Sequence, residues 1–140
     1  NRSYFGKTGT VSNEADLDFV LEIDELTGDI PLVLVMNLNS SMVWSEIEPS
    51  ADAILVSFGG GRTHSARDEI LFEIIAGNYE PSALLPMQQP EDVPRDMDCY
   101  VDADGNTYDF TFGLNWSGVI DDERVAKYNV EPIVGTNPLE

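Results

Sequence analysis

Residues Ala51 to Pro86, which read ADAILVSFGGGRTHSARDEILFEIIAGNYEPSALLP, decide the fold of this chain. An apolar run from Ala53 to Phe58 leads into three glycines, and a helical pattern follows from about Ser65 to Ala76. A strand that passes through a glycine loop into an amphipathic helix is typical of a parallel α/β unit. Because ligands bind beyond the carboxyl ends of such strands, we expect a site in the loop after Phe58.

Three residues at the tip of this loop, Arg62, Thr63 and His64, are the candidate substrate-facing residues. The loop sequence GGGRTH lacks the last glycine of G-x-G-x-x-G and the G-K-[ST] ending of a P-loop, so nucleotide binding at Gly59 to Gly61 is the weaker alternative. His64 is the only histidine of the chain, and a single histidine without spaced carboxylates makes a poor metal site. We therefore predict a turn or a glycan-facing loop here, with no metal and no cofactor.

The segments around this loop predict further helix and strand. A first helix is predicted from a cap at Ser12 or Asn13 to about Leu26, with Gly28 as its C-cap. The run from Leu32 to Leu38 is so continuously apolar that we predict a central strand, parallel to the one that ends at Phe58. The helix after the glycine loop is predicted to bury one face, formed by Ala66, Ile70, Leu71, Ile74 and Ile75.

Prolines and turn residues dominate the chain after Tyr79. Four closely spaced prolines predict an extended belt over the surface, namely Pro81, Pro86, Pro90 and Pro94. Residues Cys99 to Phe112 alternate well enough for a hairpin with its turn at Asp104 to Asn106. This turn is favoured over a calcium-binding loop, because Gly105 comes two positions too early for an EF-hand.

These elements predict an α/β fold with a mostly parallel sheet flanked by helices, as a three-layer sandwich, and a C-terminal β-hairpin. We place a lead-in loop at residues 1–11, the sandwich domain at 12–118, and a turn and tail at 119–140. With 140 residues, 42 % of them hydrophobic, the chain is long enough for one such domain.

The formal charge of −19, from 26 acidic and 7 basic residues, argues against nucleic acid and anionic membrane surfaces as partners. The single cysteine, Cys99, excludes an intrachain disulfide, a multi-cysteine zinc site and an iron–sulfur cluster. Some of the acidic residues are candidates for paired catalytic carboxylates, but no spacing singles out a pair, and solvated surface charge is the favoured interpretation. These candidates are Glu46, Glu48, Asp68, Glu69 and Glu73.

Several short motifs follow one another in a distinctive order. They are ADAILVSFG, a helix ending in IIAG, then YEPSALLPMQQP, DVP and YVDADGNTYDFTFGLNW. This order resembles the C-terminal half of the α/β sandwich domain of family 3 glycoside hydrolases, the β-glucosidase type, over roughly Pro31 to Trp116. Family members typically show N/E-P-S-G-x-L-P and then D-x-x-G-x-x-Y-x-F-x-x-G-L. In this chain Ala83 replaces the glycine of the first pattern, and the loop from Gly60 to Glu69 is a few residues longer.

The resemblance implies that the intact enzyme is a retaining exo-β-glycosidase that releases terminal β-linked glucose, with an aspartate nucleophile and a glutamic acid that protonates the leaving oxygen. In the family these two groups lie in a preceding barrel domain and upstream of Leu32, and neither has a matching motif here. We therefore expect a non-catalytic C-terminal fragment that is inactive alone. Its expected partners are the upstream barrel domain and, in the intact enzyme, a carbohydrate substrate.

Two further expectations follow from this resemblance. An exposed sheet edge in such a fragment would allow a homodimer to form. The alternative function, of another class, is a stand-alone carbohydrate-binding or interaction module of the same fold without catalytic activity.

Overall fold

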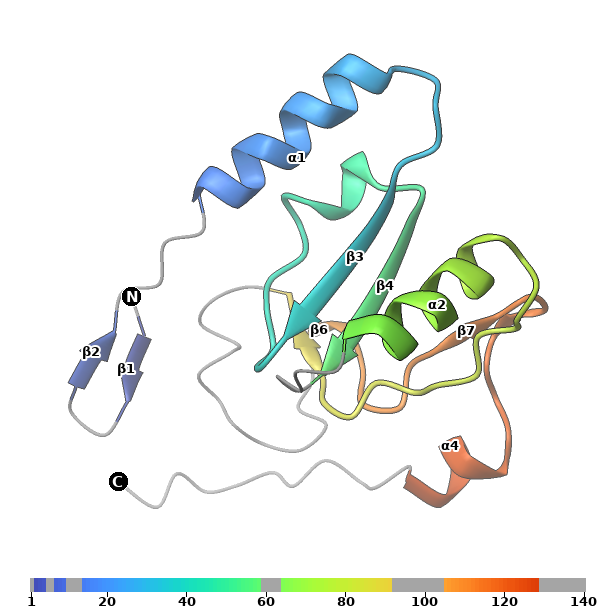
Figure 1. The fold of residues 1–140 in the computed structure, drawn as a ribbon. Helices are drawn as coiled ribbons and strands as arrows, with labels where there is room; N and C mark the ends of the chain where they lie inside the picture. The colour runs from blue at the N-terminus through green and yellow to red at the C-terminus, as the bar shows by residue number, and fades with distance from the viewer. Residues whose placement is uncertain (1, 5–6, 10–13, 59–63, 92–104, 129–140) are drawn as a thin grey trace. The chain divides into compact units, whose positions relative to one another are not determined.

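A computed structural model describes residues 2–4, 7–9, 14–58, 64–91 and 105–128 of the chain (Figure 1). Its contacts divide the chain into a first unit, residues 1–36 with 44–57, and a second unit, residues 37–43 with 58–140. The elements in chain order are β1 (Arg2–Tyr4), β2 (Lys7–Gly9), α1 (Glu14–Thr27), β3 (Val33–Leu38), the 3-10 helix η1 (Glu48–Ser50), β4 (Ala53–Phe58), α2 (His64–Ile75), β5 (Gln89–Pro90), β6 (Asn106–Tyr108), β7 (Leu114–Asn115), β8 (Gly118–Val119) and α4 (Glu123–Tyr128).

The prediction of a mostly parallel sheet in a three-layer sandwich is wrong. The described strands form four separate two-stranded pairs, β1–β2, β3–β4, β5–β6 and β7–β8. Only β3 and β4 run in the same direction (Figure 1), and the other three pairs are antiparallel. The apolar run in β3 suggested burial on both faces, but Val35 in its middle is exposed. A strand can thus be continuously apolar without lying inside a large sheet.

The predicted C-terminal hairpin also differs from the structure. The first half of the predicted hairpin, from Cys99 to its turn at Asp104, falls within residues 92–104, which lie outside the described part of the chain. The second half, β6, pairs with β5, with Gln89 opposite Tyr108. Further toward the C-terminus, β7 and β8 form a hairpin in which Leu114 lies opposite Val119. Within the described residues the alternation indicated strand correctly at Asn106–Tyr108, but it carried no information about the partner strand.

Helix α1 forms as its sequence predicts, and its end at Gly28 is confirmed. Gly28 has a φ of 57°, a left-handed conformation that favours glycine, and its N–H donates to the carbonyl oxygen of Asp24 at 3.1 Å. The hydroxyl of Thr27 donates to the carbonyl oxygen of Ile23 at 2.9 Å. The predicted caps Ser12 and Asn13 lie outside the described residues.

The core of the first unit is small. Among the described residues, the apolar side chains buried in it are those of Leu34, Trp44 and Ile47, and Trp44 is only 2 % exposed. Trp44 opens the turn that leads to η1, because its carbonyl oxygen accepts from the N–H groups of Ile47 and Glu48 at 3.0 and 2.9 Å. This turn lies in the connection between β3 and β4, so the connection itself supplies core side chains to the unit.

Asp52 fixes the register at the start of the parallel pair. Its carboxylate accepts from the N–H of Leu32 at 2.8 Å, and its own N–H donates to the carbonyl oxygen of Leu32 at 2.9 Å. Two reciprocal hydrogen bonds between the same residues set which positions of the two strands lie opposite each other.

We expect Asp52→Ala to lower the free energy of unfolding by about 1 kcal/mol, because the Leu32 N–H loses a charged acceptor at an exposed position. Asp52→Asn keeps an oxygen acceptor and should lose less than half of that. Urea unfolding of both variants measures the difference, with Glu46→Ala, an exposed carboxylate of the same unit, as the control. An alanine variant as stable as the wild type would contradict this role of Asp52.

Helix α2 has the predicted extent but not the predicted burial. It ends before Gly77, whose φ is 73°, as the sequence indicates. Ile70 and Ile75 were predicted to be buried, yet they are 56 % and 44 % exposed, while Leu71 and Ile74 are half-buried. The helical period predicts an apolar stripe correctly, but the stripe is buried only where another element covers it. Without the predicted sheet, the described part of this face remains largely open to solvent.

Candidate functional site

The structure does not test the prediction of a substrate-facing loop. Arg62 and Thr63, together with the three glycines before them, lie outside the described residues. His64 is the first residue of α2, and its side chain also lies outside the described part. The three candidate residues therefore stay a prediction from the sequence.

The candidate carboxylates lie mainly on the surface. Glu46, Asp68, Glu69 and Glu73 are exposed, and Glu48 is half-buried. A general acid needs an apolar or charged neighbourhood that raises its pKa, which exposed positions do not offer. Among the described residues, no group of three or more His, Cys, Asp and Glu side chains is arranged to hold a metal ion. The described carboxylates thus do not form a recognisable catalytic arrangement.

The best-defined arrangement in the second unit joins two of the motifs that carry the family resemblance. The N–H of Leu85 in YEPSALLP donates to the carbonyl oxygen of Phe112 in YDFTFGLNW at 2.7 Å. In return, the N–H of Thr111 donates to the carbonyl oxygen of Leu85 at 3.0 Å. We call this the motif junction. It brings segments more than twenty residues apart into direct backbone contact.

Gly113 is where the motif junction packs most tightly. A Cβ atom at this position would overlap the carbonyl oxygen of Ala83 and would lie 3.0 Å from Cδ2 of Leu84. The carbonyl oxygen of Gly113 accepts from the N–H of Ile120 at 2.9 Å, which ties the β7–β8 hairpin to the same point. The glycine of the F-x-x-G-L motif is therefore required here by close packing.

Thr111 takes an unusual backbone conformation beside this glycine. Its φ is 71°, which is rare for a β-branched residue, and its side chain is buried. Such a conformation persists only where the surroundings hold it in place. The hydrogen bond from its N–H to Leu85 is one such restraint.

Gln89 links a third segment to this region. It is completely buried, its Oε1 accepts from the N–H of Met42 at 3.1 Å, and its Nε2 donates to the carbonyl oxygen of Met87 at 3.4 Å. A buried amide is stable only when it is hydrogen-bonded, and this one connects residues 47 positions apart. Sequence reasoning missed this role, because a glutamine between Met87 and Pro90 carries no periodic or motif signal.

Arg124 attaches α4 to the YEPSALLP segment. Its Nη1 donates to the carbonyl oxygen of Ser82 at 2.7 Å, and its Nη2 forms an ion pair with Oδ2 of Asp122, also at 2.7 Å. The hydrogen bond from this guanidinium lowers the pKa of Asp122 below its ordinary value of 3.8. The sequence predicted a turn and a tail at 119–140, but not this attachment.

The lowered pKa of Asp122 predicts a pH dependence of this contact. A carboxyl with a depressed folded-state pKa stabilises the fold above its unfolded value of 3.8, and this contribution is lost as the pH falls through the lower folded value. An NMR titration of the Asp122 carboxyl should therefore give a midpoint below 3.8, and Arg124→Met should move it upward. A wild-type midpoint at or above 3.8 would contradict the ion pair.

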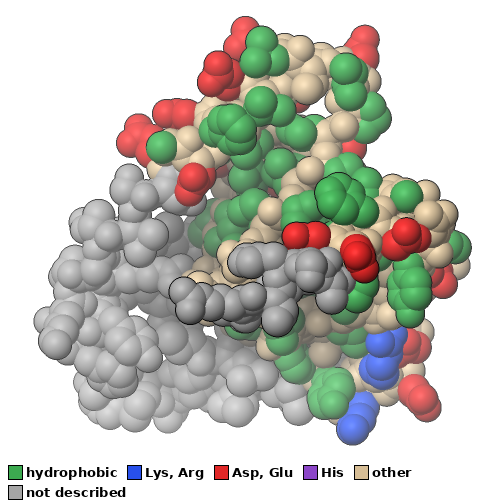
Figure 2. Space-filling view, viewed as in Figure 1, with side chains coloured by type: hydrophobic (Ala, Val, Ile, Leu, Met, Phe, Trp, Pro, Cys, Tyr) green, Lys and Arg blue, Asp and Glu red, His purple; other side chains and the backbone are tan. Residues whose placement is uncertain are grey.

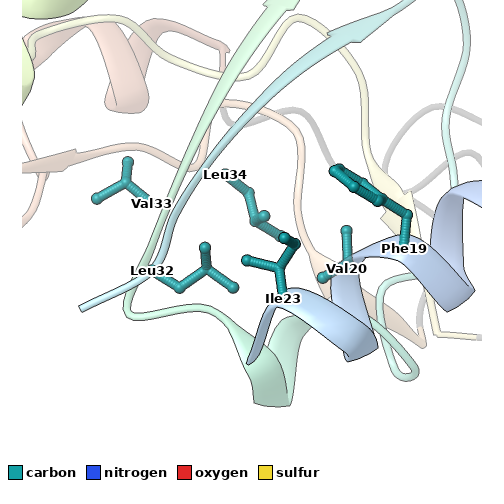
Figure 3. A pocket seen from close by; sticks show the side chains of 6 residues that line it. All are labelled: Phe19, Val20, Ile23, Leu32, Val33 and Leu34. Atoms are coloured by element: carbon teal, nitrogen blue, oxygen red, sulfur yellow. The ribbon is translucent and has the colours of Figure 1, made fainter. Parts of the chain in front are cut away.

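The first unit contains an apolar groove between α1 and the start of β3. Its volume is about 300 Å³, and Figure 3 shows the residues that line it, Phe19, Val20, Ile23, Leu32, Val33 and Leu34. None of these side chains can donate a proton, act as a nucleophile or bind a metal. The groove can therefore receive an apolar group, but it cannot perform chemistry.

In the described part of the chain, every helix is too short or too polar to cross a lipid bilayer. Comparison with protein-family models, with curated proteins and with solved structures finds no match to this chain.

Proposed function

We propose that this chain is a non-catalytic C-terminal part of a family 3 exo-β-glycosidase of the β-glucosidase type. In that role it packs against the barrel domain that carries the aspartate nucleophile. Because the chain as a whole has no match, the proposal depends on its short motifs, on their order and on how they contact one another.

The motif junction is the observation that carries this proposal. Motifs that belong to one family domain are expected to meet in space. Here the P-S-A-L-L-P segment and the F-T-F-G-L segment exchange two backbone hydrogen bonds through Leu85, and the motif glycine, Gly113, packs against Ala83. The two patterns behave as parts of one structural unit, as expected for patterns inherited together.

The exposure of four of the candidate carboxylates favours a structural role for this chain over a catalytic one. Retaining hydrolysis needs a nucleophilic carboxylate and a general acid on opposite sides of the scissile bond. Neither has a motif in this chain, and Glu46, Asp68, Glu69 and Glu73 lie exposed on the surface. In the intact enzyme, both catalytic groups would then come from outside the described residues.

An assay with an aryl β-glucoside tests this proposal. The chain of 140 residues should release the aryl group no faster than buffer. Turnover that is abolished by substituting the chain's own carboxylates, with Glu46→Gln, Glu48→Gln, Asp68→Asn, Glu69→Gln and Glu73→Gln tested one at a time, would overturn it.

A further inference from the structure

Apolar side chains of the groove, and others on or next to α1, extend into solvent. Phe19 lines the groove and is 63 % exposed, and Leu26 on the same helix and Ile30 after it are also exposed. In Figure 3, side chains of α1 and of the strand extend into the space between the two elements. A contiguous exposed apolar patch is a feature of protein binding surfaces.

The described part of the first unit carries its two basic residues, Arg2 and Lys7, in β1 and β2, and the rest of it carries charge of one sign. Residues 14–36 and 44–57, the described part of the first unit apart from β1 and β2, contain ten acidic residues and no Lys, Arg or His. The acidic residues are Glu14, Asp16, Asp18, Glu22, Asp24, Glu25, Asp29, Glu46, Glu48 and Asp52. Figure 2 shows acidic side chains interspersed with apolar ones over α1. Any partner that enters the groove must therefore approach through a strongly negative field.

The negative charge favours some binding partners of an apolar groove over others. A second copy of the chain would bring the same ten acidic residues against the first, which disfavours self-association. A segment with apolar side chains on one face and Lys or Arg beside them is complementary both to the apolar groove and to the acidic residues. Its apolar side chains fill the groove while its cations meet the acidic rim, as in helix-in-groove recognition.

We propose that the groove between α1 and β3 binds a basic amphipathic segment of another protein. The volume of about 300 Å³ lies at the lower end of the range for binding clefts, so it admits a few side chains rather than a whole folded element. Phe19 and Ile23 provide the contact from the helix, and Leu32 provides it from the strand side.

The test uses the complete chain and a labelled helical peptide of about 18 residues, or roughly five turns, with Leu on one face and Lys on the other. Fluorescence anisotropy should show binding that weakens at least fivefold between about 50 and about 300 mM NaCl, because salt screens exposed charges. A matched peptide with Glu in place of each Lys should bind at least tenfold more weakly.

Two matched variants separate the groove from general attraction to an acidic protein. Phe19→Ala removes a groove side chain and should weaken binding of the Leu/Lys peptide at least tenfold. Phe72→Ala removes an equally exposed phenylalanine from α2, in the second unit, and should leave binding unchanged. Both side chains are mostly exposed, so neither change should unfold the chain.

Three outcomes would overturn the proposal: equal binding of the Leu/Lys and Leu/Glu peptides, an unchanged Kd for Phe19→Ala, or a dimer of the chain that Phe19→Ala dissociates. The last outcome would assign the groove to a second copy. Because the groove lies in the first unit and the motif junction in the second, failure of peptide binding would leave the glycosidase proposal intact.

Discussion

Gly113→Ala is expected to lower the free energy of unfolding by about 3 kcal/mol, at the upper end of the usual cost of overpacking. The added Cβ would overlap the carbonyl oxygen of Ala83, and a backbone atom cannot move aside as the end of a side chain can. The overlap can therefore be relieved only if the YEPSALLP segment moves away from Gly113. This movement would also strain the hydrogen bonds of Leu85 at the motif junction. Urea unfolding followed by circular dichroism measures the loss.

Gly77→Ala is the matched control for this substitution. Gly77 lies in the same unit and has a φ of 73°, but a Cβ there would meet no heavy atom within 4 Å. Alanine at Gly77 should therefore cost only the strain of a left-handed residue, about 1 kcal/mol. If the two substitutions had equal effects, close packing at Gly113 would not be the reason for its glycine.

Trp44→Ala is expected to destabilise the first unit by about 4 kcal/mol, since it removes the largest side chain of a small core. A loss of this size is a large part of the total stability of a typical domain, about 5–15 kcal/mol. Trp44→Phe keeps much of the apolar volume and should cost less than half as much. Circular dichroism in urea is the suitable measurement, because it does not depend on tryptophan fluorescence.

Trp116→Ala provides the comparison for Trp44→Ala. Trp116 is 63 % exposed, and its hydrogen bond to the carboxylate of Glu80 comes from its backbone N–H, which alanine retains. Its replacement should change the free energy of unfolding by no more than about 0.5 kcal/mol. A similar loss from both tryptophans would mean that burial of Trp44 does not organise the first unit.

Local structure was largely predictable from the sequence. The ends of α1 and α2 at Gly28 and Gly77 follow from the need for a left-handed residue after each helix. The strand from Ala53 to Phe58 has the predicted bounds, because a short apolar run between turn residues is a local signal. Such features depend on residues that are adjacent in the sequence, so they can be predicted from it.

Features that depend on distant partners were not predictable. Nothing in Asn106–Tyr108 indicates that β6 pairs with β5 rather than with the strand expected before it. The apolar faces of α1 and α2 indicate that something should cover them, but not whether the same chain provides the cover. The prediction of a sandwich was wrong for this reason. The apolar patterns indicated a large sheet, but the described residues do not form one.

The same distinction applies to the candidate sites. The loop at Arg62 to His64 was predicted because loops after parallel strands often hold ligands, and its role stays a prediction. The apolar groove was missed, although Phe19 and Ile23 lie within the predicted first helix. Its position depends on how that helix faces the start of β3, which only the folded chain reveals.

The most direct test of the glycosidase proposal is to determine the complete natural polypeptide that contains these residues, from its transcript and its intact mass. We predict a longer polypeptide in which a barrel domain with a nucleophilic aspartate precedes this region, and which hydrolyses an aryl β-glucoside with retention of configuration. A complete natural polypeptide without such a barrel, or one that has the barrel but lacks this activity, would contradict the assignment.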